Sequence, residues 1–368
     1  MRKALGIIVV TLAAGCVFAA GCSGCNGTGK NVSPLASNWY TYTGYRNIQP
    51  TFIEGDTPLE HKEIIKYDVA FKAPTIGNAT YSINYENGSY TTEFYAKKFD
   101  TTLVHDDYKS GYEGKNIIAY YYHTEFKADV TYKYGEQSKE FKDSQIITDC
   151  YFLPVENELR PLYSKQVVKS PSPAILQATS LESCYTEYDS VYESYYAYNG
   201  SSVKTKITDN LNSKNNKEAQ RGVGGASNSL FDVTSLDIVL RALIGSSFNQ
   251  TIDLYSPLNA IKTFTLSSPG VYLTDVEKEA IQGKLKDKGL YVPVIKDEKE
   301  VGLQTTAVTV SSNLELQGVS QTYWFAKVEN KRNNVGRATL LKISLPVVFN
   351  LGSLEYTLSE ITSTLWNE

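Results

Sequence analysis

The chain has 368 residues, of which 42% are hydrophobic, and its 36 basic and 40 acidic side chains give a formal net charge of −4. This length is sufficient for one large domain or two ordinary domains with hydrophobic cores. A mildly acidic chain without a block of basic residues is a poor candidate for binding nucleic acid. We therefore predict no nucleic-acid partner.

The N-terminal segment has the pattern of a secretory signal. Arg2 and Lys3 precede residues 4–21, which contain no charged side chain, and this arrangement is typical of a signal peptide. An uncleaved anchor helix is the alternative, because the 18 uncharged residues approach the roughly 20 that span a bilayer. Removal of residues 1–21 would also remove Arg2 and Lys3 and leave a net charge of −6.

The same segment ends in Ala19-Ala20-Gly21-Cys22, which resembles the bacterial lipobox, although Ala19 stands where Leu is commonest. The resemblance implies that acyl chains on Cys22 anchor an exported protein to the outer face of a bacterial membrane. Cys16 is a competing site, but cleavage there would leave an apolar mature end. We predict a signal peptide over residues 1–21, a lipidated Cys22, a polar tether over 22–45 and a folded body over 46–368.

Five cysteines are present. If Cys16 leaves with the signal and Cys22 is acylated, Cys150 and Cys184 are the two cysteines of the body, and outside the cytoplasm they could form a disulfide. Two separate buried thiols are the alternative, because a single pair has no spacing signature. We predict that Cys150 and Cys184 lie close together.

Tyrosine is in excess, with 28 residues against 13 phenylalanines, and it favours half-buried strands. Residues 65–73 alternate between apolar and polar side chains, which predicts a strand. Residues 81–85 and 90–96 alternate in the same way, and Asn87-Gly88 between them predicts a hairpin with a type I′ turn.

Further strands are predicted along the rest of the chain. Two flank Gly135, over residues 117–134 and 138–148, and a second hairpin is predicted to turn at Asn199-Gly200. Strands over 305–310 and 322–328 come before a final pair over 341–349 and 354–358. Residues 210–228 are rich in Asn, Gly, Lys and Ser, which predicts a mobile loop or a hinge between two halves of the body.

Two helices are predicted. The first covers residues 229–244, with Ser229 or Asp232 as its N-cap. Its apolar stripe contains Leu236, Val239, Leu240 and Leu243. The second covers residues 274–288 and opens with a capping box of Thr274 and Glu277. The pattern as a whole predicts a mainly β fold: a curved antiparallel sheet or half-barrel with one or two helices on its concave face.

The order of these features resembles an exported bacterial domain family of unknown function with the open half-barrel fold of the lipoprotein carriers LolA and LolB. The likeness is carried by Tyr67-Asp68-Val69, Ile76-Gly77-Asn78-Ala79-Thr80, Leu159-Arg160-Pro161-Leu162, Phe231-Asp232-Val233 and Gly352-Ser353-Leu354. It extends over most of residues 65–358. The chain is longer than the typical member, and residues 164–200 have no counterpart in the family pattern. The resemblance implies binding rather than catalysis.

Motifs of catalysis are missing from the sequence. It contains no Gly-rich phosphate loop, no G-x-S-x-G elbow and no H-E-x-x-H helix. His105-Asp106-Asp107 would hold a metal only if further ligands converged on it. We therefore predict no catalytic residue, no metal and no cofactor. The tyrosines of residues 185–198 could bind sugars or peptides, although cross-strand tyrosines also stabilise sheets.

Our leading functional hypothesis is a non-enzymatic binding protein for a hydrophobic ligand such as an acyl chain or a lipoprotein. In that hypothesis the apolar stripe at Leu236, Val239, Leu240 and Leu243 contacts the ligand, and the helix either plugs the concave face or covers it as a lid. The alternative is a structural or adhesive surface protein that binds a protein or carbohydrate partner. An enzyme is the third possibility.

Overall fold

The computed structural model describes residues 8–10, 15–17, 62–74, 80–155, 158–174, 178–223, 230–243, 249–256, 260–268, 272–292, 303, 305–312, 320–330, 336–347 and 351–363. The prediction for Cys22 and for the tether over 22–45 lies outside these residues.

Strands dominate the structure. Those of the first half are β1 (Ile8–Val10), β2 (Gly15–Val17), β3 (Glu63–Lys72), β4 (Tyr81–Lys98), β5 (Ile118–Tyr134), β6 (Gln137–Val155), β7 (Glu158–Pro173), β8 (Tyr185–Tyr196), β9 (Ser202–Asp209) and β10 (Lys217–Gly222). Those of the second half are β11 (Leu230–Asp232), β12 (Asn249–Ser256), β13 (Ala260–Ser267), β14 (Leu290–Tyr291), β15 (Thr306–Ser312), β16 (Ser320–Asn330), β17 (Gly336–Pro346) and β18 (Ser353–Ser363).

The described helices are short. They are α2 (Lys109–Tyr112), α3 (Leu236–Leu240) and α4 (Asp275–Asp287), with 3₁₀ turns η2 (Thr101–Leu103), η3 (Asp106–Tyr108), η5 (Leu181–Ser183), η6 (Ser213–Asn215), η7 (Val233–Ser235) and η8 (Arg241–Leu243). In the described part of the chain, no helix is long and apolar enough to cross a bilayer.

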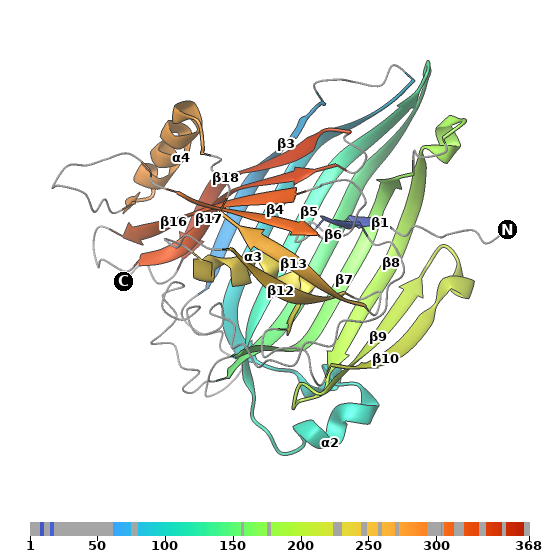
Figure 1. Ribbon diagram of the computed structural model, residues 1–368, viewed down its shortest axis with the longest axis vertical. Helices are drawn as coiled ribbons and strands as arrows, with labels where there is room; N and C mark the ends of the chain where they lie inside the picture. The colour runs from blue at the N-terminus through green and yellow to red at the C-terminus, as the bar shows by residue number, and fades with distance from the viewer. Residues whose placement is uncertain are drawn as a thin grey trace.

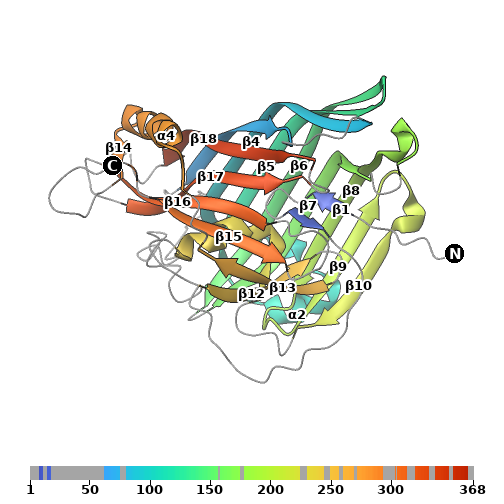
Figure 2. The ribbon, with the colours of Figure 1, turned by 45° about the horizontal axis from the view of Figure 1, so that its top comes forward.

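One 16-stranded sheet contains every strand from β3 to β18, in the order β10-β9-β8-β7-β6-β5-β4-β3-β18-β17-β16-β15-β13-β12-β11, with β14 added beside β16. All its neighbours are antiparallel except β11 and β12. The sheet is open and curved, so that the strands after β11 lie across the concave side of the long strands (Figure 1, Figure 2). The predicted mainly β fold is confirmed. β1 and β2 form a separate antiparallel pair.

The predicted turn at Asn87-Gly88 is wrong. β4 runs through these residues without reversing, and its register with β5 shifts between Glu86 and Ser89, which marks a β-bulge. Asn87 has φ 53°, the left-handed conformation that Asn tolerates in both bulges and type I′ turns. Gly88 passes so close to β3 that a methyl group there would lie 2.6 Å from the carbonyl oxygen of Val69. The dipeptide therefore bends the strand instead of ending it.

The other strand predictions are confirmed. Gly135 and Gly200 have positive φ and lie in the turns that join β5 to β6 and β8 to β9. β15 and β16 cover the segments predicted before the last pair, and β17 and β18 form that pair, with Gly352 between them.

The loop predicted over residues 210–228 is wrong in part, because 217–222 form the edge strand β10. The two halves of the body share one sheet, since β3 pairs with β18.

The helix predicted over 229–244 is shorter than expected. Residues 230–232 are extended and pair with β12. The helical part begins only after Asp232, because the carboxylate of this residue caps it by accepting a hydrogen bond from the amide of Thr234. A 3₁₀ turn, α3 and a second 3₁₀ turn follow. α3 lies between the long strands and the strands that cross them (Figure 1), which places it on the concave face, as predicted.

α4 has the predicted capping box of Thr274 and Glu277. It lies on the opposite face of the sheet from α3. Lys284 of α4 contacts Asp68, and Glu277 contacts Lys342 at 2.5 Å. Asp68 and Lys342 alternate along their strands with core residues such as Tyr67 and Ile343, so they point away from the core. Of the helices that the structure describes, α3 lies on the concave face and α4 does not.

Candidate functional site

The apolar stripe of the central helix is part of the hydrophobic core. Leu236, Val239 and Leu240 are at most 1% exposed and pack in the main cluster of buried side chains. Leu243 lies in η8, and its side chain is outside the described part. A stripe packed in this way contacts neighbouring side chains rather than solvent, which fits a plug better than a lid.

Two buried carboxylates hold the same helical segment in place. Asp232 accepts hydrogen bonds from Ser164 at 2.7 Å and from the hydroxyl of Tyr196. Asp237 accepts hydrogen bonds from Tyr90 at 3.3 Å and from Tyr122. Burial raises the pKa of Asp237 to about 6, although the hydrogen bond from Tyr122 opposes the shift. Buried polar groups with partners of this kind fix a segment in one position.

A buried ionic cluster completes this core. Glu63 of β3 lies 2.6 Å from Arg241 of η8 and 3.4 Å from Arg337 of β17. All three side chains are at most 2% exposed, so an external ligand does not reach them. The cluster connects both ends of the body with the helical plug, and its role is structural.

Neither cysteine of the body is in a disulfide. Cys150 of β6 and Cys184, which follows η5, are both buried free thiols. The thiol of Cys184 donates to the carbonyl oxygen of Ser180 at 3.3 Å. Burial raises the pKa of both thiols, which keeps them protonated and poorly nucleophilic.

The segment His105-Asp106-Asp107, which would hold a metal only with further ligands, is engaged in other contacts. His105 accepts a hydrogen bond from the amide of Asp107, while Asp106 pairs with Lys109 at 2.6 Å and Asp107 pairs with Lys204. Among the residues that the structure describes, no group of three or more His, Cys, Asp or Glu side chains is arranged to hold a metal ion.

The outer, convex face of the sheet carries a feature that the sequence did not reveal, a row of directly opposed tyrosines on five neighbouring strands. We call it the tyrosine row: Tyr95, Tyr121, Tyr151, Tyr163 and Tyr195. Neighbouring ring centroids are 4.9 to 6.3 Å apart. Its first two rings are half-buried, whereas the third and fourth are buried. Of these five tyrosines, only Tyr195 lies in the tyrosine-rich segment over residues 185–198 that the sequence analysis describes.

Cations and hydrogen-bonding groups surround the more exposed end of the row. The ammonium of Lys97 lies 3.5 Å from the ring centroid of Tyr121 and 4.9 Å from that of Tyr151, distances at which a cation is attracted to an aromatic face. Asp149 accepts hydrogen bonds from Tyr121 and, at 2.9 Å, from His123. The hydrogen bond to Asp149 raises the pKa of His123.

The loop between β4 and β5, residues 99–117, folds back over the other end of the row. Its two ends are held together by a hydrogen bond from the amide of Phe99 to the carbonyl oxygen of Ile117. Tyr112 donates to the backbone oxygen of Tyr196 at 2.7 Å. Compact surface loops with close ends and their own packed side chains are frequently functional.

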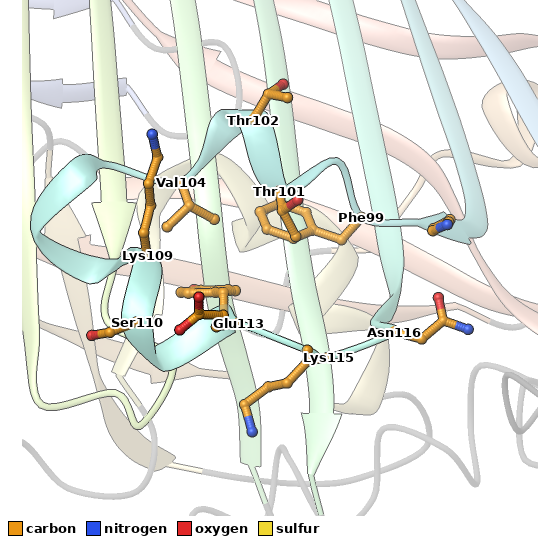
Figure 3. Close-up of a pocket in the computed structure, with 12 residues that line it drawn as sticks. Phe99, Thr101, Thr102, Val104, Lys109, Ser110, Glu113, Lys115 and Asn116 are labelled. Atoms are coloured by element: carbon orange, nitrogen blue, oxygen red, sulfur yellow. The ribbon is translucent and has the colours of Figure 1, made fainter.

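This loop contains an open pocket of about 1040 Å³, which we call the loop pocket. Its lining residues are Lys98, Phe99, Thr101, Thr102, Val104, Lys109, Ser110, Tyr112, Glu113, Gly114, Lys115 and Asn116. Figure 3 shows Phe99 and Thr101 on one side, with Lys109, Ser110 and Glu113 across from them. Most of these side chains are polar, which differs from the apolar lining of a typical lipid site.

The loop pocket and the tyrosine row are connected through packed aromatic rings. Phe99 lines the pocket and also contacts Tyr151, with ring centroids 5.3 Å apart. Tyr151 in turn contacts Tyr121, which contacts Tyr95. An aromatic path therefore leads from the pocket to the half-buried end of the row.

Comparisons with protein-family models, with curated proteins and with solved structures returned no significant match.

Proposed function

We propose that this chain is a membrane-tethered extracytoplasmic lipoprotein that binds a carbohydrate on the outer face of its sheet and does not act on it as an enzyme. The observation that carries the proposal is the connection of the loop pocket to the tyrosine row through packed aromatic rings. Aromatic rings offer an apolar face to the C–H side of a sugar, while the hydroxyl, amide and charged groups of the pocket suit its hydroxyls.

The spacing of the row supports a polymeric ligand. Neighbouring strands of a sheet lie about 4.8 Å apart, so Tyr95 and Tyr121, the two half-buried rings, offer neighbouring aromatic contacts at about this interval, whereas Tyr151 and Tyr163 are buried. A polymer of repeating sugar units presents the same chemistry at regular intervals too. A hydrophobic ligand is less well supported, because Leu236, Val239 and Leu240 are packed in the core and several charged and hydroxyl side chains line the loop pocket.

Binding is tested with the purified full chain on a panel of polysaccharides. Tyr121→Ala should weaken binding about tenfold or more, a loss of about 1.4 kcal/mol, because the ring is half-exposed at the open end of the row. Tyr272→Ala is the matched control, since this tyrosine is 77% exposed and precedes α4 on another part of the molecule. A wild-type protein that binds a fluorescent fatty acid and no polysaccharide would overturn the proposal in favour of a hydrophobic ligand.

The anchor is tested separately. We propose that Cys22 is the acylated residue, as its lipobox-like context supports. Cys22→Ala should then move the protein from the membrane fraction to the soluble fraction. If Cys22→Ala stays with the membrane and Cys16→Ala does not, the anchor is at Cys16.

A further inference from the structure

We infer that Lys97 determines the specificity of this surface, because it caps the aromatic rings in the free protein and admits a polyhydroxylated ligand such as a sugar in preference to an apolar one. The inference rests on the proposed function. Lys97 and Tyr95 are two residues apart on β4, and Tyr95 lies directly opposite Tyr121 on β5. Residues two apart on a strand point to the same face, so Lys97 extends over the outer face beside these rings.

The ammonium of Lys97 lies among three aromatic rings. It is 3.5 Å from the ring centroid of Tyr121, 4.9 Å from that of Tyr151 and 5.8 Å from that of Tyr95. A cation within about 6 Å of a ring centroid is attracted to the aromatic face. At 3.5 Å the ammonium occupies the place where the C–H side of a sugar would stack on Tyr121. A ligand that stacks there must therefore displace it.

Lys97 is partly withdrawn from water. Its side chain is half-buried, whereas that of its neighbour Lys98 is exposed. Desolvation lowers the pKa of Lys97, and the carboxylates of Asp149, Asp100 and Glu93 oppose this lowering. A charged group that has lost part of its hydration needs polar or electron-rich partners, and in the free protein the rings are among them.

The cap makes different ligands unequal. A sugar carries hydroxyl oxygens that accept hydrogen bonds from an ammonium group, so Lys97 exchanges its ring contacts for new acceptors when a sugar binds. An apolar aromatic or aliphatic molecule offers no acceptor, and the displaced ammonium then loses the rings and gains nothing from the ligand. Specificity is a difference between two affinities, so an obstacle to the wrong ligand contributes to it as much as a contact with the right one.

The second lysine at these rings is held differently. Lys62 lies 5.1 Å from the ring centroid of Tyr95 and pairs with Glu93 at 2.6 Å. Its ammonium therefore keeps a carboxylate partner when a ligand arrives. Lys97 is the lysine whose ring contact a ligand on Tyr121 would break.

The specificity is tested with the full chain on two kinds of ligand. One is the tightest-binding member of a panel of xyloglucan, galactomannan, laminarin and polygalacturonate, and the other is the neutral aromatic probe N-phenyl-1-naphthylamine. Lys97→Met keeps the length of the side chain but removes its donors and charge. It should weaken polysaccharide binding several-fold and strengthen probe binding about two- to fivefold. The ratio of the two affinities should fall by about tenfold.

Two further variants control this measurement. Lys97→Arg keeps the charge, the donors and the attraction to aromatic faces, so its affinity ratio should stay close to that of the wild type. Lys286→Met, at an exposed site on α4, should change neither affinity.

The cap itself is tested without a ligand by NMR of the full chain with labelled lysine. Ring currents should shift the side-chain proton resonances of Lys97 upfield from those of Lys98, and Tyr121→Leu should remove most of that shift. Unshifted Lys97 resonances, or an unchanged affinity ratio in Lys97→Met while the polysaccharide is still bound, would overturn the inference alone. If the wild-type protein binds no polysaccharide, the proposed function and the inference fail together.

Discussion

Gly88 is a residue whose missing side chain matters for stability. A methyl group there would lie 2.6 Å from the oxygen and 2.9 Å from the Cβ of Val69 on β3. We expect Gly88→Ala to lower the free energy of unfolding by about 1–3 kcal/mol, because the two strands must move apart. Gly283→Ala is the control, since a methyl group in α4 meets nothing within 4 Å and should stabilise the helix by up to about 1 kcal/mol. Denaturant titration of both variants measures the difference.

Asp237 should make stability depend on pH. Burial raises its pKa from 3.8 to about 6, so the folded protein holds the proton more tightly than the unfolded chain does. The resulting stabilisation is complete below about pH 4 and is lost as pH rises through 6, by at most about 3 kcal/mol. Asp237→Asn cannot titrate, so the change in unfolding free energy between pH 4.5 and pH 7 should be less negative in the variant than in the wild type. Equal pH dependence in both proteins would contradict the burial of this carboxyl.

At the scale of elements, α3 acts as the plug of the curved sheet. Leu240 is fully buried, and we expect Leu240→Ala to lower the free energy of unfolding by about 2–5 kcal/mol through lost transfer energy and a new cavity. Val276→Ala, at a site 76% exposed on α4, should change it by less than about 0.5 kcal/mol. Denaturation curves test both. A small loss for Leu240→Ala, with altered uptake of a fatty-acid probe, would indicate a lid.

Alternation of side chains was enough to predict most strands, because a sheet with one buried face imposes a period of two. The turn at Asn87-Gly88 could not be told from a bulge, since both place Asn in the left-handed conformation. The extended start at residues 230–232 was also missed, because β11 depends on pairing with β12, far along the chain.

The tyrosine row was beyond prediction for a related reason. A regular hairpin turning at Gly135 would place Tyr121 opposite Cys150. The bulge between Ala128 and Val130 shifts the register by one residue and brings Tyr121 opposite Tyr151. The loop pocket is likewise built by the way residues 99–117 fold back on the sheet, and no motif marks it.

At the scale of the whole molecule, Glu63 connects β3, η8 and β17 through Arg241 and Arg337. We expect Glu63→Gln to lower the free energy of unfolding by about 3–5 kcal/mol, because two arginines would remain buried without their carboxylate. Glu360→Gln is the control, since its pair with Lys66 is exposed and contributes less than about 1 kcal/mol. Thermal unfolding of the two variants should differ clearly, and similar melting temperatures would contradict a structural role for the cluster.

The pairing of β3 with β18 has a consequence for biogenesis. Lys66 and Glu360, which bond across this pair, are 294 positions apart in the chain, and contacts so distant in sequence slow folding. A chain that emerges N-terminus first can join β3 to β4 early, but the other edge of β3 stays open until β18 arrives. An open edge is a template for association with other chains. The nascent protein is therefore most exposed to aggregation while β18 is still missing, which favours chaperone protection until synthesis is complete.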